Sequence, residues 1–205
     1  MKIRKTFLLY FISLCILVIS SGAKAAPAPT DAISGTINSI LDTLRDKELS
    51  QPSKEIERRE KIGILIRDRF DFKEMSKRSL ARHWKKISPD DQKQFVSIFS
   101  DLLEASYTGK IEKYTDEKVT YDKEKIKGKG KYGVVSTSIV TKSVNIPIDY
   151  KLKLKNDKWW VYDVVIEGVS FVSTYRSQYN KIIIKESFAK LIEKMNAQLD
   201  KVNAL

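Results

Sequence analysis

The stretch IPIDYKLKL, residues 146–154, alternates apolar and polar side chains without interruption. Its even-numbered residues are apolar or aromatic, and its odd-numbered residues are proline, aspartate and lysine. Because successive side chains of a β-strand point to opposite faces, the alternation predicts a strand with one buried face and one hydrated face. Such a strand fits an antiparallel sheet that is covered on one side.

Further runs rich in β-branched and aromatic residues lie at 119–121, 132–141 and 159–166. They are separated by Gly, Asn, Asp and Lys, which are frequent in turns and on hydrated strand ends. We therefore expect these runs and residues 146–154 to form a twisted antiparallel meander.

The connection between residues 146–154 and 159–166 decides how these two strands pair. A two-residue turn at Asn156 and Asp157 would set Tyr150 opposite Asp163. A three-residue loop would align the even-numbered apolar residues of the two strands, and a shift of one residue reverses every side chain. We favour the three-residue loop. The even-numbered face of the second strand would then carry Trp160, Tyr162, Val164 and Ile166.

Apolar residues at helical spacing precede and follow the predicted sheet. We expect helices over 31–44, over 52–70, from Asp71 to residue 80, and from Ser88 to residue 107, with Asp71 and Ser88 as caps. The first of these helices should bury Ile33, Ile37, Ile40, Leu41 and Leu44. The second should bury Ile56, Ile62, Leu65, Ile66 and Phe70. With a C-terminal helix over 173–205, these elements predict an α+β fold.

The N-terminus has the pattern of a secretion signal. Lys2, Arg4 and Lys5 precede an apolar run over residues 7–19, and small residues follow at Ala23 and Ala25. The run is shorter than the roughly 20 residues that span a bilayer, which disfavours an uncleaved anchor. We therefore expect residues 1–25 to be a cleaved signal peptide and residues 26–205 to form a single exported domain.

The chain is basic, with a formal net charge of +12, and it stays basic when the predicted signal is removed. Export excludes most nucleic-acid partners, so we expect no nucleic acid. A basic surface on an exported protein indicates anionic lipid headgroups or acidic proteins as partners, or simply favours solubility.

The predicted mature chain has few residues that carry chemistry. Cys15 lies within the signal, His83 is the chain's one histidine, and no phosphate-cradling loop or zinc-ligand spacing is present. Asp163 and Glu167 could form an acid–base pair inside a cone-shaped sheet, but outward-facing polar positions explain them better. We therefore expect no enzyme, no catalytic residues, no metal and no cofactor.

Several separated segments resemble the MlaC family of periplasmic phospholipid-binding proteins, also called toluene-tolerance or ABC-transporter auxiliary proteins. The resemblance rests on segments 70–75 and 80–84, and on the apolar pattern from Ile87 to Tyr114. Its strongest parts are WVYDVVIEGVS, residues 160–170, and YRSQY, residues 175–179. Two positions depart from the family pattern. Ala81 stands where the family commonly has glycine, and residues 185–187 stand where a glycine-containing helix break is expected.

The resemblance implies a fold whose helices and twisted sheet enclose an apolar cavity for lipid tails, with phospholipid as cargo. It implies a periplasmic carrier that moves phospholipid between an outer-membrane lipoprotein complex and an inner-membrane MCE-domain ring with its ABC transporter, supporting outer-membrane lipid asymmetry. Two alternatives stay open: a small cone-fold (NTF2-like) enzyme that uses Asp163, and a secreted interaction module without a ligand.

Apolar faces and the family resemblance together suggest which side chains form the cavity wall. A pocket for acyl chains needs mainly apolar and aromatic lining. The predicted lipid-binding residues are Phe95, Phe99, Leu102, Tyr107, Ile148, Tyr150, Leu152, Val169 and Tyr175.

Overall fold

The computed structural model describes residues 27–113, 118–141 and 144–204, so the predicted signal peptide lies outside the described residues. A five-stranded antiparallel sheet follows the chain order β1-β2-β3-β4-β5. The strands are β1 Lys118–Lys127, β2 Tyr132–Val140, β3 Asn145–Lys155, β4 Lys158–Ile166 and β5 Val169–Ser170. The predicted meander is confirmed.

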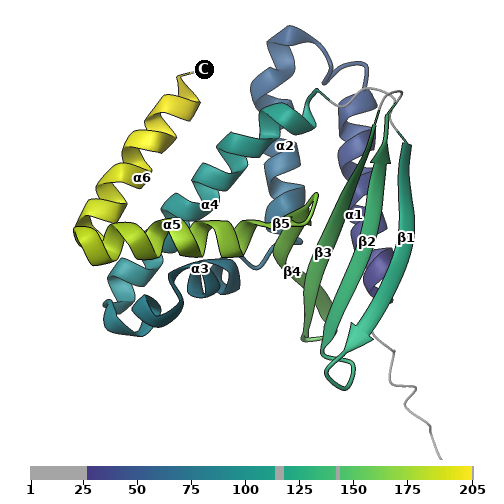
Figure 1. The fold of residues 1–205 in the computed structure, drawn as a ribbon. Helices are drawn as coiled ribbons and strands as arrows, with labels where there is room; N and C mark the ends of the chain where they lie inside the picture. Colours follow the sequence, from purple (N-terminus) through teal and green to yellow (C-terminus); the bar gives the residue numbers. More distant parts are fainter. Residues whose placement is uncertain (1–26, 114–117, 142–143, 205) are drawn as a thin grey trace, which may run out of the picture.

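Helices precede and follow the sheet along the chain (Figure 1). Before it come α1 Pro29–Arg45, α2 Glu55–Arg67, α3 Phe72–Leu80 and α4 Pro89–Ile111, with short 3-10 turns at Pro52–Lys54 and Ala81–Lys86. After it come α5 Phe171–Lys185 and α6 Phe188–Asn203. Helix α1 packs against the sheet, while α3 to α6 gather beside the sheet. The α+β fold is confirmed.

The predicted helix caps are present. The Asp71 carboxylate accepts a hydrogen bond from the Glu74 backbone N–H at 3.0 Å. Ser88 and Asp91 form a reciprocal capping box at the start of α4. These bonds satisfy backbone donors that the first helical turn leaves free, which explains why α3 and α4 begin where they do.

The strand register corrects the expected three-residue loop. Lys155 pairs with Lys158, so Asn156 and Asp157 form a two-residue turn, and both have positive φ, 48° and 56°. The register then shifts between Lys151 and Leu152, because β4 carries an extra residue there, Tyr162.

The bulge also corrects the expected faces of β4. Odd-numbered Trp159 and Val161 and even-numbered Val164 belong to one buried cluster, because the extra residue changes the parity of the strand. Beyond the bulge Tyr150 faces Val164, so the even-numbered residues align as expected, but only in that half of the hairpin.

Two helix predictions were wrong in part. Ile56 was expected in the buried face of α2, but 82% of its surface is exposed, because this end of α2 is fastened by charged side chains. The single helix expected over 173–205 is two helices. The Ser187 hydroxyl caps α6 by accepting from the Lys190 N–H at 3.0 Å, and the chain turns at Glu186.

Candidate ligand-binding cavity

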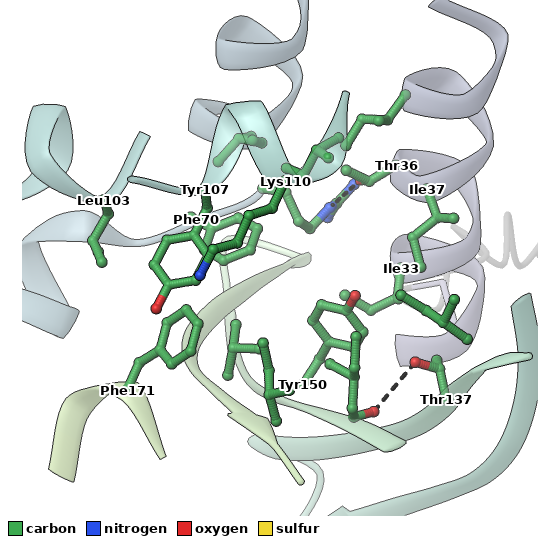
Figure 2. Close-up of a pocket in the computed structure, with 18 of the residues that line it drawn as sticks. Ile33, Thr36, Ile37, Phe70, Leu103, Tyr107, Lys110, Thr137, Tyr150 and Phe171 are labelled. Carbon is green, nitrogen blue, oxygen red and sulfur yellow. Dashed lines mark hydrogen bonds between the residues drawn. The ribbon is translucent and has the colours of Figure 1, made fainter. Parts of the chain in front are cut away.

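A cavity of about 610 Å³ lies between α1, the sheet and the helices α2 to α5. Its wall is mainly apolar and comes from distant parts of the chain (Figure 2). The lining residues on the helices, with Arg69 and Phe70 between α2 and α3, are Ile33, Thr36, Ile37, Ile40, Leu41, Leu44, Ile66, Arg69, Phe70, Phe72, Met75, Leu103, Glu104, Tyr107, Lys110, Ile111 and Phe171. Those on and next to the sheet are Val119, Thr137, Ile139, Ile146, Ile148, Tyr150, Val164, Ile166 and Glu167.

The cavity exists because two separate cores do not merge. One cluster joins α1 to the sheet through residues such as Ile33, Val135 and Leu152, and the other joins α3, α4, α5 and α6. Phe70 and Phe171 pack against both clusters. Apolar side chains bound the space between the cores, and no protein atoms fill this space.

The apolar stripe of α1 forms one wall of this space. Ile37, Ile40, Leu41 and Leu44 lie on the predicted face, yet each is only half-buried. A helix stripe that packs on protein is normally buried, so partial exposure on this face indicates surface that another apolar group could cover.

Aromatic rings form the wall at α4 and α5. The rings of Tyr107 and Phe171 stack with centroids 4.6 Å apart, and the Lys110 ammonium lies 4.8 Å from the Tyr107 ring centroid. From the sheet, the half-buried Tyr150 ring points into the cavity, opposite Ile33 on α1 (Figure 2). Burial raises the pKa of Tyr150 to about 12, so its phenol is neutral at physiological pH.

Few charged groups interrupt the wall. Arg69 donates from Nε to the Thr36 hydroxyl at 2.9 Å and from Nη1 to the Trp159 carbonyl at 2.7 Å. Glu104 pairs with Arg67 of α2, and burial raises the pKa of Glu104 although Arg67 opposes the shift.

The structure brings part of the predicted wall together. Tyr107, Ile148 and Tyr150 line the cavity. Phe95 and Phe99 instead stack on each other inside the helical cluster, with centroids 5.6 Å apart, and Tyr175 packs edge-on against Phe99 at 5.2 Å. Leu102 and Leu152 are buried outside the lining, and Val169 is 59% exposed. Contact of any of these side chains with lipid stays a prediction.

Sequence reasoning missed the α1 stripe, Phe70 and Phe171 as lining residues. Periodicity shows which face of an element is apolar, but it does not show whether protein or a ligand covers that face. The stripe of α1 is itself visible in the sequence, where its spacing predicts a buried face.

Asp163 lies outside the cavity wall and is 4% exposed. Its carboxylate accepts hydrogen bonds from the Ser170 hydroxyl at 2.7 Å and the Val172 N–H at 3.1 Å, and pairs with the Lys151 ammonium at 2.9 Å. These bonds tie β3 and β4 to the start of α5. Asp163 therefore has a structural role. Its buried carboxylate does not reach a ligand in the cavity.

Comparison with known proteins agrees with this architecture. The chain is 27% identical over 120 residues to the intermembrane phospholipid transport system binding protein MlaC of Haemophilus influenzae, covering 57% of this chain and 56% of that protein. It is 22% identical over 157 residues to the toluene tolerance protein ttg2D of Pseudomonas putida, covering 76% and 73%. The chain thus matches little more than half of the length of the first relative.

A solved structure shares the fold. The phospholipid-binding protein from Ralstonia solanacearum, determined in complex with a phospholipid, superimposes with a TM-score of 0.77 at 20% identity, covering 86% of this chain and 99% of that one. The family model described as MlaC protein matches residues 34–197, which is most of the chain and reaches from within α1 into α6. The chain therefore belongs to the MlaC protein family.

Proposed function

We propose that this chain binds a phospholipid, with the acyl chains in the cavity between α1, the sheet and α4, and carries it between membranes. The observation that carries this proposal is the apolar cavity of about 610 Å³, which is within the usual range of ligand pockets. The relatives and the lipid-bound structure with the same fold support phospholipid as the cargo.

The energetics of a lipid in water explain why such a carrier is needed. Two acyl chains hold about 30 methylene groups, and exposing them costs on the order of 20 kcal/mol. A cavity as apolar as a membrane makes the transfer nearly balanced, so that handover needs no covalent step. This supports a carrier without a catalytic residue, and the enclosed position of Asp163 gives the alternative enzyme no support.

We also propose that residues 1–25 direct export, that residues 26–205 form the lipid-binding domain, and that the protein works in the periplasm in support of outer-membrane lipid asymmetry. Its partners would be an outer-membrane lipoprotein complex and an inner-membrane MCE-domain ring with its ABC transporter. Within the described residues, no helix has the length and apolar character needed to cross a bilayer.

The test is to purify the exported protein gently and to measure bound lipid by native mass spectrometry and organic extraction. Ile139→Trp should lower the amount of lipid per protein several-fold, because Ile139 is a half-buried wall residue and the larger ring occupies space that the ligand needs. Ile126→Trp is the matched control, since Ile126 is exposed and outside the wall.

Diacyl lipid in the wild type and in Ile126→Trp, together with depletion in Ile139→Trp, supports the proposal. Wild-type protein that is reproducibly empty and does not take up phospholipid from vesicles would contradict it. Equal lipid content in both variants would show that the ligand binds elsewhere.

A further inference from the structure

Arg69 is an unusual member of the cavity wall. It follows the end of α2, and its neighbours in the lining are largely aliphatic and aromatic, including Ile33, Ile66 and Phe70. None of the ion pairs between described residues includes Arg69. The guanidinium is therefore a cation in a mainly apolar wall without a direct counter-ion.

The two acids in the lining, Glu104 and Glu167, do not pair with Arg69. Glu104 is paired with Arg67, and Glu167 is exposed beyond the end of β4. Burial lowers the pKa of Arg69, while the Asp68 carboxylate opposes this shift. An arginine remains charged in proteins, so the unfavourable burial is not relieved by loss of a proton.

The guanidinium is held in one orientation by neutral groups. The Thr36 hydroxyl donates to the Ala32 carbonyl at 3.1 Å and accepts from Arg69 Nε, so both of its roles are used. The Trp159 carbonyl accepts from Nη1. The Nη2 amino group donates to no described residue, and Figure 2 shows the dashed Thr36 contact at the edge of the cavity.

We propose that Arg69 forms an anion subsite inside the cavity, which pairs with a negatively charged oxygen group of the bound amphiphile. This proposal rests on the proposed function. The chemistry is that of a phosphodiester or a carboxylate, because a planar guanidinium with fixed donors matches the oxygens of both. An anionic amphiphile supplies the missing counter-ion, and a neutral one of the same chain length does not.

The alternative role of Arg69 is purely structural, since its two hydrogen bonds join α1 to β4. The two roles predict different ligand selectivity. Loss of a structural brace weakens the binding of every ligand, whereas loss of an anion subsite weakens the binding of charged ligands only.

The experiment compares delipidated wild type with Arg69→Gln for two pairs of probes. Palmitate is paired with hexadecanol, and phosphatidylglycerol is paired with diacylglycerol of the same chains. Arg69→Gln should weaken binding of an anionic probe about tenfold and change its neutral partner by less than about twofold, since hydrogen bonds to charged groups contribute strongly. Arg69→Lys should retain part of the preference. Arg82→Gln removes one charge outside the cavity, and it should change the binding of neither anionic nor neutral probes.

Selective loss for palmitate identifies the carboxylate as the bound group, and selective loss for phosphatidylglycerol identifies the phosphodiester. Equal weakening of charged and neutral probes, or no weakening, overturns the subsite while leaving the proposed function intact. A wild type that binds none of the probes refutes the proposed function itself. Should Arg69→Gln not fold, Thr36→Val removes one hydrogen bond but keeps the charge. The Thr36→Val variant should retain the preference for anionic probes. Loss of this preference in Thr36→Val would overturn the proposal.

Discussion

Ala81 has a backbone conformation that is unfavourable for its residue type. It joins α3 to the next turn with φ 47° and ψ −116°, a region that side chains with a Cβ rarely adopt. Glycine, which the family resemblance led us to expect at this position, adopts positive φ without a steric cost.

Ala81→Gly should therefore stabilise the protein by about 1 kcal/mol, raising the melting temperature by about 2–4 °C. Ala197→Gly is the matched control, because Ala197 is exposed inside α6 and the same change there should destabilise by about 1 kcal/mol. Thermal unfolding followed by circular dichroism measures both. Loss of stability in Ala81→Gly would show that this strain is absent in solution.

Glu104 should make stability depend on pH. Burial raises its pKa, with opposing contributions from Arg67, and one carboxylate oxygen is buried without a partner among the described residues. The folded state thus binds the proton more tightly than the unfolded state, so stability falls as the pH rises from the unfolded-state pKa through the native pKa.

Glu104→Gln should accordingly be more stable than wild type at about pH 7, by up to about 1 kcal/mol, and this advantage should shrink near pH 4. Urea unfolding at both pH values measures it, with exposed Glu60→Gln as the control. A variant less stable at neutral pH would mean that the ion pair with Arg67 outweighs the cost of burial.

At the scale of elements, α2 is fastened to α4 by charge. Glu112 follows α4, and its side chain is 11% exposed and accepts from both Arg58 and Arg59 of α2 at 2.8–3.0 Å. Ion pairs that are partly removed from water are costly to break from one side. Ile56 is exposed on the same segment, so little apolar contact supplements these bonds there.

Glu112→Gln should lower the free energy of unfolding by about 1–2 kcal/mol, because it leaves the half-buried Arg58 guanidinium without its partner. Glu193→Gln removes an exposed pair with Lys190 and should cost less than about 0.5 kcal/mol. Chemical denaturation compares the two variants. Equal effects would show that the α2 to α4 contact contributes no more than a surface pair.

The elements were largely predictable from the sequence, while the register of β4 was not. Alternation in residues 146–154 predicted β3, and the caps at Asp71 and Ser88 predicted where two helices begin. The bulge at Tyr162 changes parity inside one strand, and both faces of that strand are apolar. Neither periodicity nor composition distinguishes such a bulge from a longer loop.

For the whole molecule, the candidate site depends on what separates the two cores. The sequence indicated apolar faces on α1, α4 and the sheet, and the family resemblance indicated a cavity. Phe95 and Phe99 face the helical core rather than the space between the cores, because helix packing decides the neighbours of each apolar face. As a result, only three of the nine predicted lining residues, Tyr107, Ile148 and Tyr150, lie on the cavity wall.

Lipid binding should stabilise the whole fold unevenly. At a free ligand concentration of about 100 times Kd, binding adds about 2.7 kcal/mol, which corresponds to a rise in melting temperature of about 5–10 °C. Amide hydrogen exchange should slow in α1 and at the end of α4, which line the cavity, more than in α6, which does not. Uniform slowing across α1 and α6 would contradict a ligand held between the two cores.

Because of the space between the cores, the volume change on unfolding depends on whether lipid is bound. Water fills a mainly apolar cavity poorly, and hydrostatic pressure favours whichever state eliminates internal voids. Delipidated protein should thus unfold at lower pressure than loaded protein, even where the two are compared at temperatures of equal stability. Trp159 is 3% exposed in the core next to the cavity, so tryptophan fluorescence, to which Trp159 contributes, can follow the transition under pressure. In this sense the lipid completes the interior that the polypeptide leaves unfilled.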